Sequence, residues 1–528
     1  LLTTKVGTIT PLLVDEVIPN ETVNLKVNLS ATLPPLASDT FMRCQLKTEA
    51  FFVPTRLLNG AYEEWLTGTK VQIANTTYDT FMPCLKFTSN TSSAMTGAGT
   101  LLDYLGYSYV PGTNTTVPTG GTISALPFIA YHKIWDDWYR NPLITKSCFS
   151  KLFPMGTSSS IATTGIKYAP YLMYRNAGSA TYNFEGTNND LTLQDGKTIW
   201  QLRQRNFGAD YFTTATPNAQ NGAAQSVSFD IPIPSGITSG SSASTSSQFT
   251  ISALRAANSM QQFLERNNIA GSRLVDYVRA HYGASLSDGV AQRTVLLGSA
   301  AFDVYSKGIY QTSNISGSTN NPFAGSVGAE FGSAYASGTD FIIKGFTANE
   351  PGYIFVMVSL VPKVTYSTGV RRYLTHYVGA GSVTDLANPL LQNVGQQPIY
   401  KYEMNGNLTN TDVWGYTDRY AEFKTMEDQL HGLLRDGQSL QSFALQKSYN
   451  LDSITSISTQ SLEIPANYLN QVTAVSNAVG QYGVWIDSFL DYKVSMPLAQ
   501  YAVPSLQDPA YEHGNDVKVE RGGSYIRG

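Results

Sequence analysis

Side chains that could carry out catalysis are few in this sequence, and they are scattered. The sequence contains no HExxH motif, no His–Cys cluster and no GxSxG elbow. Gly196-Lys197-Thr198 resembles the end of a phosphate-binding loop, but Leu191 occupies the position of the loop's first glycine. The sequence therefore predicts no catalytic, cofactor-binding or metal-binding site, and it does not predict an enzyme.

Asp136 and Asp137 form a carboxylate pair in an aromatic setting, because Trp135 and Trp138 flank them. Such a pair could act on a sugar. Neighbouring positions on a helix point about 100° apart, so the two carboxylates would not face one substrate. A solvated helix face is the preferred interpretation, and His281 is predicted to make a hydrogen bond near a helix end.

Two groups of basic residues are candidates for contact with nucleic acid. Arg203 and Arg205 lie close to Phe207, and the C-terminal sequence KVERGGSYIRG contributes Lys518, Arg521, Tyr525 and Arg527. Arginines interleaved with aromatic residues can bind phosphates and stack on the bases of single strands. The alternative for the second group is an ordinary flexible basic tail.

The composition is low in charge for a chain of this size. At 528 residues the chain must either divide into domains or carry large insertions on one core. Charged residues make up 14% of the sequence, against about 25% in ordinary soluble proteins. The net charge of −4 does not indicate a strongly basic nucleic-acid-binding protein. An uncharged surface rich in tyrosine suits burial against other subunits, with a secreted β-protein as the alternative.

Cysteine content and hydropathy indicate where the chain is made. Cys44, Cys84 and Cys148 leave at least one thiol unpaired and have no metal-ligand spacing, which favours a reducing cytoplasm. No apolar run approaches the roughly 18 residues of a membrane helix, so no membrane insertion is expected. Leu1 does not begin a signal peptide, and the lack of an initiating methionine suggests that an earlier segment was removed or lies outside this sequence.

Two long alternating stretches predict the β-core that must position the other elements. In residues 23–33 and 42–52, apolar and polar residues alternate, which is typical of half-buried strands. Pro34 and Pro35 separate the stretches, because proline cannot donate to a sheet ladder. We expect one strand in each of two facing sheets, with both apolar faces lining the same core.

An aromatic helix is predicted between Ser124, as the N-cap, and Asn141-Pro142, which ends it. Its broad aromatic face should dock on a large partner surface, within the subunit or between subunits. A second aromatic segment, residues 412–424, is interpreted as an ordered loop with the same two possible roles. The anchor residues predicted for the two segments are Tyr131, Trp135, Trp138, Tyr139, Trp414 and Tyr416.

The remaining elements are helices in the middle of the chain and strands after them. A helix is expected from Thr250 to about Asn267, followed by one over residues 272–282 whose Leu274, Val275, Val278 and Tyr282 should point inward. Residues 353–361 are apolar on both faces and should form a strand in the middle of a covered sheet. We predict one antiparallel β-core with insertions, a single domain over residues 1–528.

Low-complexity sequence predicts an exposed segment. Residues 235–247 consist almost entirely of Ser, Gly and Thr, which cannot bury enough apolar area to form a core. An exposed loop or surface projection is predicted there, represented by Ser235, Gly240 and Ser244. The polar, glycine-rich tail over residues 505–528 is predicted to be extended.

Several segments in order resemble the major capsid protein of microviruses, small tailless icosahedral phages with single-stranded DNA, and in particular its gokushovirus-like branch. They are FFVPTRLL, ISALPFIAYHKIWDDWYRNP, RNFGADYFTTATP, GFTANEPGYIFVMVSLVPKVTY and VWGYTDRYAEFK. The resemblance extends from near Val14 to about Pro504. Residues 215–248 correspond to the surface insertion of that branch and are shorter than expected for it. The projection would therefore be small, or built partly from residues 143–201.

The resemblance implies a fold and a function. The fold would be mainly β, an eight-stranded antiparallel viral jelly-roll barrel with long loop and helical insertions. Sixty copies would form a T=1 shell around circular single-stranded DNA, assembled in the cytoplasm of a bacterial host. Implied partners are a DNA pilot protein, a small DNA-binding protein and a host receptor. The competing hypothesis is an extracellular carbohydrate-binding or -cleaving β-protein, such as a phage adhesin or depolymerase.

Overall fold

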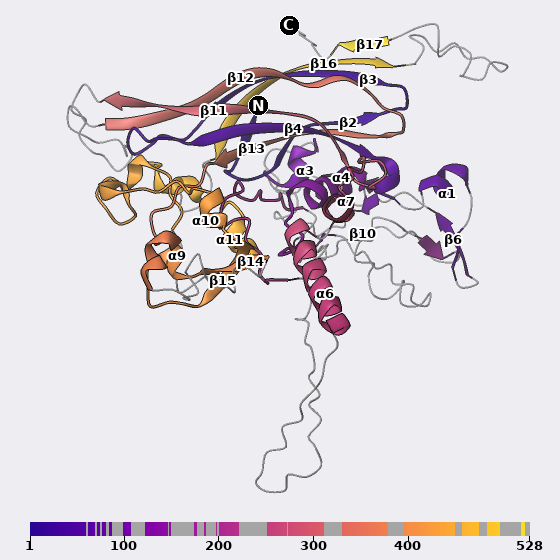
Figure 1. The fold of residues 1–528 in the computed structure, drawn as a ribbon. Coiled ribbons are helices and arrows are strands. Elements are labelled where there is room, and N and C mark those ends of the chain that lie inside the picture. The colour runs from indigo at the N-terminus through magenta and orange to yellow at the C-terminus, as the bar shows by residue number, and fades with distance from the viewer. Residues whose placement is uncertain are drawn as a thin grey trace, which may run out of the picture.

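The computed structural model describes most of the chain, and Figure 1 shows how its elements are arranged. The described residues are 1–59, 62–68, 71–73, 76–80, 84–86, 99–106, 122–145, 147–148, 174–176, 184–185, 197, 200–220, 251–271, 273–310, 330–378, 395–448, 457–474, 483–496 and 519–522. Both the predicted projection at Ser235, Gly240 and Ser244 and most of the tail over residues 505–528 lie outside them. No helix in the described residues is long and apolar enough to cross a membrane.

Eight antiparallel strands form one sheet that curls into a nearly closed barrel. Their order is β1-β16-β3-β12-β11-β4-β13-β2. The strands are β1 Leu2–Thr4, β2 Thr10–Val17, β3 Thr22–Thr32, β4 Cys44–Pro54, β11 Val295–Tyr310, β12 Glu330–Thr347, β13 Gly352–Pro362 and β16 Val484–Met496. A further strand, β17 (Val519–Gly522), pairs with β16. The predicted fold class, a mainly β jelly-roll barrel with insertions, is confirmed.

The two strands predicted first lie in opposite halves of the barrel. β3 pairs with β12 and β16, whereas β4 pairs with β11 and β13. β11 connects the halves, because residues 295–303 pair with β4 and residues 304–310 with β12. The apolar side chains of both strands meet in one core, as predicted.

β13 is buried along its whole length because it has a core on each side. Ile354, Val356 and Val358 face the barrel interior. Phe355 and Met357 point the other way and pack in a second core beneath α4 (Leu126–Ile134). The prediction of a covered central strand is confirmed.

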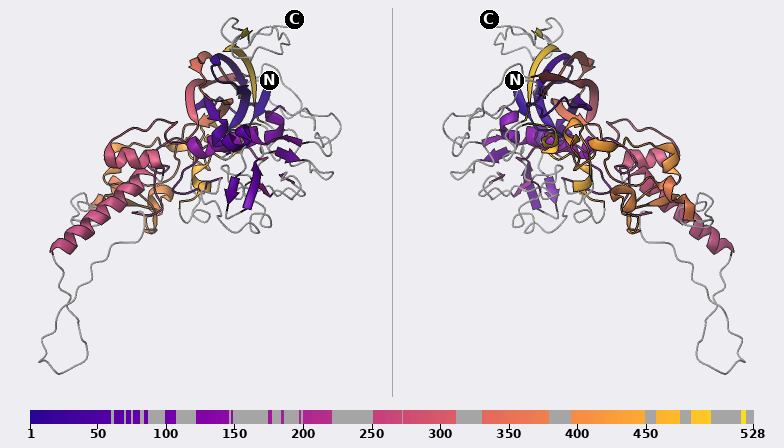
Figure 2. Two further views of the ribbon diagram at one scale, coloured as in Figure 1. Left: turned by 90° about the vertical axis from the view of Figure 1, so that its right-hand side faces the viewer. Right: turned by 90° about the vertical axis from the view of Figure 1, so that its left-hand side faces the viewer.

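The described insertions lie on one side of the barrel, as both views in Figure 2 show. The β14–β15 lobe (residues 363–378 and 395–448) contains η3 Arg372–Val378, β14 Gln396–Tyr400, α9 Tyr402–Asn405, β15 Val413–Asp418, α10 Ala421–Lys424, η4 Gly432–Leu434 and η5 Gln441–Phe443. The predicted aromatic loop over residues 412–424 is therefore wrong, since β15 pairs with β14 there. The remaining insertion elements are η1 Thr55–Leu57, α1 Tyr62–Thr67, β5 Val71–Ile73, β6 Thr76–Thr80, β7 Cys84–Lys86, α3 Leu101–Tyr104, β8 Thr122–Ser124, β9 Tyr174–Asn176, β10 Phe184–Glu185, α11 Thr459–Leu462 and η6 Tyr468–Gln471.

Two helices follow in the middle of the chain, α6 (Ile251–Ala270) and α7 (Leu274–Tyr282), of which α6 projects away from the barrel (Figure 1). α7 ends at Gly283, whose φ of +66° favours glycine. The predicted hydrogen bond of His281 is confirmed, since its Nε2 lies 2.6 Å from Asn267 Oδ1. The predicted inward face of α7 is wrong for Leu274 and Tyr282, which are 59% and 73% exposed, whereas Val275 and Val278 are half-buried.

Candidate functional site

The aromatic helix packs within its own subunit. α4 starts at Leu126, whose N–H donates to Ser124 Oγ at 3.3 Å, so the predicted N-cap is one residue early. The buried Tyr131 hydroxyl donates to Ile9 O at 2.7 Å and accepts from Arg203 N at 2.8 Å. Burial raises the pKa of Tyr131, so the phenol stays neutral. Tyr131 therefore connects the helix to β2 and to the segment that follows residue 200.

The other aromatic residues of this helix continue into η2 (Trp135–Tyr139) and also contact the subunit core. Trp135 is buried and donates to Gln204 O at 3.1 Å. The rings of Trp138 and Tyr139 lie 5.9 and 6.0 Å from Phe51 of β4. These residues are packing anchors of the second core.

Asp136 and Asp137 are buried, so the predicted solvated helix face is wrong. Asp136 pairs with Arg140 at 2.7 Å, and Asp137 pairs with Lys133 at 2.7 Å. Asp137 also accepts from Thr294 N at 2.9 Å, at the start of β11. The pair thus connects the helix to the barrel. It is not available to a sugar, which removes the acid pair that the carbohydrate hypothesis needed.

Arg203 is buried in the folded subunit, which argues against its predicted contact with DNA. Arg205 is half-buried, and its contact with DNA stays a prediction. Arg203 is 0% exposed, donates to His132 Nδ1 at 3.0 Å and lies over the Trp135 ring. Arg205 donates to both carboxylate oxygens of Glu49, at 2.6 and 3.0 Å. Their guanidinium groups fix the segment after residue 200 against the helix and β4.

The second basic group lies mostly outside the described residues. Arg521 belongs to β17, where it is the register partner of Val494 in β16. Lys518, Tyr525 and Arg527 are not described. Contact between this group and DNA stays a prediction.

The second aromatic segment holds residues 205–217 against the lobe. Trp414 is buried, and its ring lies 6.4 Å from that of Phe212. Tyr416 N donates to Thr216 O at 2.8 Å, and Thr216 N donates back to Tyr416 O at 2.8 Å. Trp414 therefore contributes to packing inside the subunit, and Tyr416 connects the two segments through its backbone.

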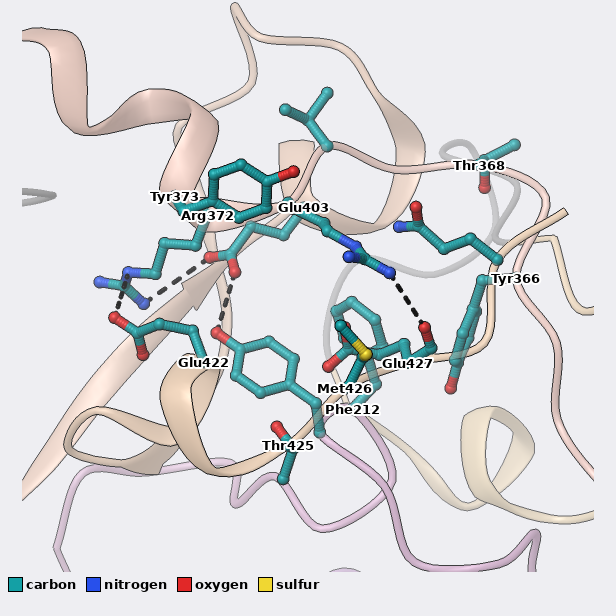
Figure 3. A pocket seen from close by; sticks show the side chains of 14 residues that line it. Phe212, Tyr366, Thr368, Arg372, Tyr373, Glu403, Glu422, Thr425, Met426 and Glu427 are labelled. Atoms are coloured by element: carbon teal, nitrogen blue, oxygen red, sulfur yellow. Dashed lines mark hydrogen bonds and ion pairs between the residues drawn. The ribbon is translucent and has the colours of Figure 1, made fainter. Parts of the chain in front are cut away.

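A buried charged cluster in the β14–β15 lobe was not predicted. In Figure 3, Arg372 lies between the carboxylates of Glu403 and Glu422, each 3.8 Å away. The Tyr211 hydroxyl and the Tyr400 N–H each donate to Glu403 at 2.9 Å. These side chains come from separate parts of the chain, so no local sequence pattern could bring them together.

The cluster borders a cavity of about 140 Å³. Burial raises the pKa of Glu403 to about 7, because the desolvation of the carboxylate outweighs the opposing effect of Arg372. No group of His, Cys, Asp and Glu that could hold a metal occurs in the part of the chain that the structure describes. The arrangement cross-links the lobe and makes its stability depend on pH.

Replacing Glu403 with glutamine should flatten this dependence. Between pH 4.5 and 7 the folded chain holds a proton on Glu403 that the unfolded chain releases, so folding stability falls as pH rises through this window. The loss amounts to about 3 kcal/mol for a shift of this size. Urea unfolding of wild type and Glu403→Gln at pH 4.5 and 8 measures it. Equal pH dependence in the two proteins would exclude Glu403 as its source.

Large apolar side chains are exposed on the projecting parts of the subunit. α6 exposes Leu254 and Met260, and α7 exposes Leu274 and Tyr282. On the β14–β15 lobe the exposed apolar residues are Tyr373, Leu374, Leu408, Phe423, Met426 and Leu433. By contrast, Cys44 and Cys148 are buried. Contiguous exposed apolar patches are typical of surfaces that bind other proteins.

Comparison with known proteins agrees with the barrel and its insertions. A family model described as capsid protein (F protein) matches residues 1–243 and 233–506. The capsid protein VP1 of Chlamydia phage 1 is 25% identical, over 94% of this chain and 92% of that protein. VP1 of Bdellovibrio phage phiMH2K is 24% identical, over 95% and 93%. VP1 of Spiroplasma virus 4 is also 24% identical, over 78% and 77%. This chain therefore belongs to the phage capsid F protein family and is a structural capsid protein, not an enzyme.

Proposed function

We propose that sixty copies of this chain form a T=1 icosahedral shell around a circular single-stranded DNA genome. The observation that carries the proposal is the exposed apolar surface of α6, α7 and the β14–β15 lobe. A monomeric protein rarely leaves such surfaces open to water. Copies of the chain around symmetry axes would cover them.

Closed symmetry explains how modest contacts can suffice. Each copy would use the same patches against its neighbours, and the rotation between copies limits growth to a shell. The low charge of the chain reduces the cost of removing these patches from water. The barrel then serves as a rigid frame that orients the patches.

Further partners are proposed from the position of the insertions. Residues 215–248 lead into the end of α6 that lies far from the barrel (Figure 1). We assign to this segment the contact with a host receptor. A DNA pilot protein and a small DNA-binding protein are proposed as minor components of the virion, with assembly in the host cytoplasm.

Electron microscopy of the expressed protein, with its partner proteins, is expected to show uniform small icosahedra. Met260→Glu should reduce particle yield at least tenfold, because it places a charge in an apolar contact. Gln262→Glu adds the same charge to an exposed polar position of the same helix and should leave most of the yield intact. Wild-type protein that stays monomeric under all assembly conditions would refute the shell.

A further inference from the structure

Within the described residues, one broad face of the barrel carries no insertion. This open sheet face is the outward side of β16, β3, β12 and β11, opposite the side from which α6 and the lobe project (Figure 1). Its central strand, β3, presents only polar side chains there, and none of them is acidic: Asn24, Lys26, Asn28, Ser30 and Thr32. The face therefore combines amide and hydroxyl groups with one central lysine.

Aromatic rings form a row across this polar face. Trp485 of β16 and Tyr335 of β12 are both register partners of Thr32, on its two sides. Tyr305 of β11 is in turn the partner of Tyr335, with the two ring centroids 6.2 Å apart. Directly opposite residues in an antiparallel pair point to the same side, so these rings share the open sheet face. They are 43%, 49% and 57% exposed, in the order Trp485, Tyr335 and Tyr305.

Two more rings lie further along the same strands. Phe489 is opposite Asn28, and Phe341 is opposite Lys26. The Lys26 ammonium lies 5.4 Å from the centre of the Phe341 ring. Both phenylalanines are about half exposed. Aromatic residues at outward positions of three strands, β16, β12 and β11, need a reason other than folding, because the core is filled by the alternate residues.

Charge does not dominate this face. Lys493 lies 3.8 Å from Asp491, which is also the register partner of Lys26, and a second aspartate of β16, Asp487, is the register partner of Ser30. A ligand held mainly by its phosphates would require an excess of cations. Exposed rings among amide and hydroxyl groups fit a ligand with flat faces and polar edges, such as unpaired bases.

The shape of the subunit indicates which way the face looks in a shell. In both views of Figure 2 the subunit is narrower at the barrel than where the insertions lie, whereas in Figure 1 the two layers have similar widths. Copies around a closed shell have less room at small radius than at large radius, so the narrow end fits inward. The open sheet face then looks into the lumen. β17, which contains Arg521 of the basic tail, runs along the β16 edge of the same sheet.

We propose that the open sheet face is a stacking surface for the bases of single-stranded DNA. The proposal rests on the function proposed above and names the part of the subunit that meets the genome. Trp485, Tyr335 and Phe489 supply the rings, and the polar side chains of β3 supply hydrogen bonds to base edges. Recognition is independent of sequence, since every base has a face that can stack.

Binding of a fluorescent oligo-dT of about 20 nucleotides to the full-length unassembled subunit tests this proposal. The triple variant Trp485→Ser/Tyr335→Ser/Phe489→Ser should raise Kd at least tenfold. The control variant Tyr282→Ser/Tyr373→Ser/Phe423→Ser removes three exposed rings elsewhere and should change Kd less than twofold. If stacking on the rings supplies most of the affinity, binding releases few counterions. The slope of the logarithm of the association constant against the logarithm of the salt concentration should then be shallower than about −1, the value for one or two phosphate contacts.

Unchanged affinity in the first variant, or equal losses in both, would overturn the proposal. Competition by a neutral oligosaccharide would overturn it in favour of a glycan site, and loss of shells with unchanged DNA affinity would favour a contact between copies. If the triple variant does not fold, crosslinking of bromodeoxyuridine oligonucleotides to wild type decides the question. Crosslinks should fall in β16 and β12, and crosslinks confined to other elements would refute the assignment.

The two proposals fail in distinguishable ways. Wild-type protein that forms no shell refutes the proposed function, whatever the oligonucleotide shows. Shells that form normally while the triple variant binds DNA like wild type refute only the stacking surface. Both measurements use the same purified chain.

Discussion

Asp137→Ala is expected to destabilise the folded subunit by about 3–5 kcal/mol, the usual cost of breaking a buried ion pair. The change leaves the Lys133 ammonium buried beside η2 without its carboxylate partner at 2.7 Å. It also removes the acceptor for Thr294 N, the bond that connects the helix to the start of β11. Urea unfolding of the unassembled subunit, followed by tryptophan fluorescence, measures the loss.

An exposed ion pair provides the matched control. Lys401 and Asp412 lie 3.0 Å apart, but the Asp412 side chain is 73% exposed. Asp412→Ala should therefore cost less than about 1 kcal/mol. Adding Lys133→Met to Asp137→Ala should recover part of the lost stability, because it removes the buried ammonium group that pairs with Asp137 in the wild type. If Asp137→Ala and Asp412→Ala lower the free energy of unfolding equally, the burial of the Asp137 ion pair does not increase its contribution to stability.

Phe355→Ala is expected to cost about 3–5 kcal/mol, because it opens a cavity between the barrel and the helix that covers it. Phe355 is 0% exposed and belongs to the second core, on the side of β13 that faces α4. Few neighbours can move to fill the space, since strands lie on both sides of β13. The same unfolding measurement gives the loss, and a reduced yield of folded protein would accompany it.

Phe489→Ala is the control for this prediction. It removes the same ring from an outward position of β16 that is 53% exposed, so a change of about 0.5 kcal/mol or less is expected. This result would also show that the rings of the open sheet face are not needed for folding. A large loss of unfolding free energy in Phe489→Ala would instead show that this ring stabilises the barrel.

The strands could be predicted from sequence because their signal is local. Alternation of period two in β3, and a continuous apolar run in β13, follow directly from which faces of a strand are covered. The same reason made three other features predictable from the sequence: the helix α4, the hydrogen bond of His281 and the segments shared in order with phage capsid proteins. Each depends on residues close together in the chain.

Burial of charged and polar groups could not be predicted in this way. Arg203 and Arg205 have the same local pattern whether they face DNA or the subunit interior. Their places were decided by His132 and Glu49, which lie far from them in sequence. The charged cluster around Glu403 was likewise invisible, because its members come from separate segments.

By itself, the sequence determined a β-barrel with insertions, a low-charge chain and membership of a phage capsid family. Only the tertiary structure decided which side chains are inside and which surfaces remain open. It placed Asp136 and Asp137 inside, turned Leu274 and Tyr282 outward, and lined up Trp485 with Tyr335 across β3. The physical reason is that periodicity is set by the backbone of one element, whereas burial depends on what distant segments pack against it.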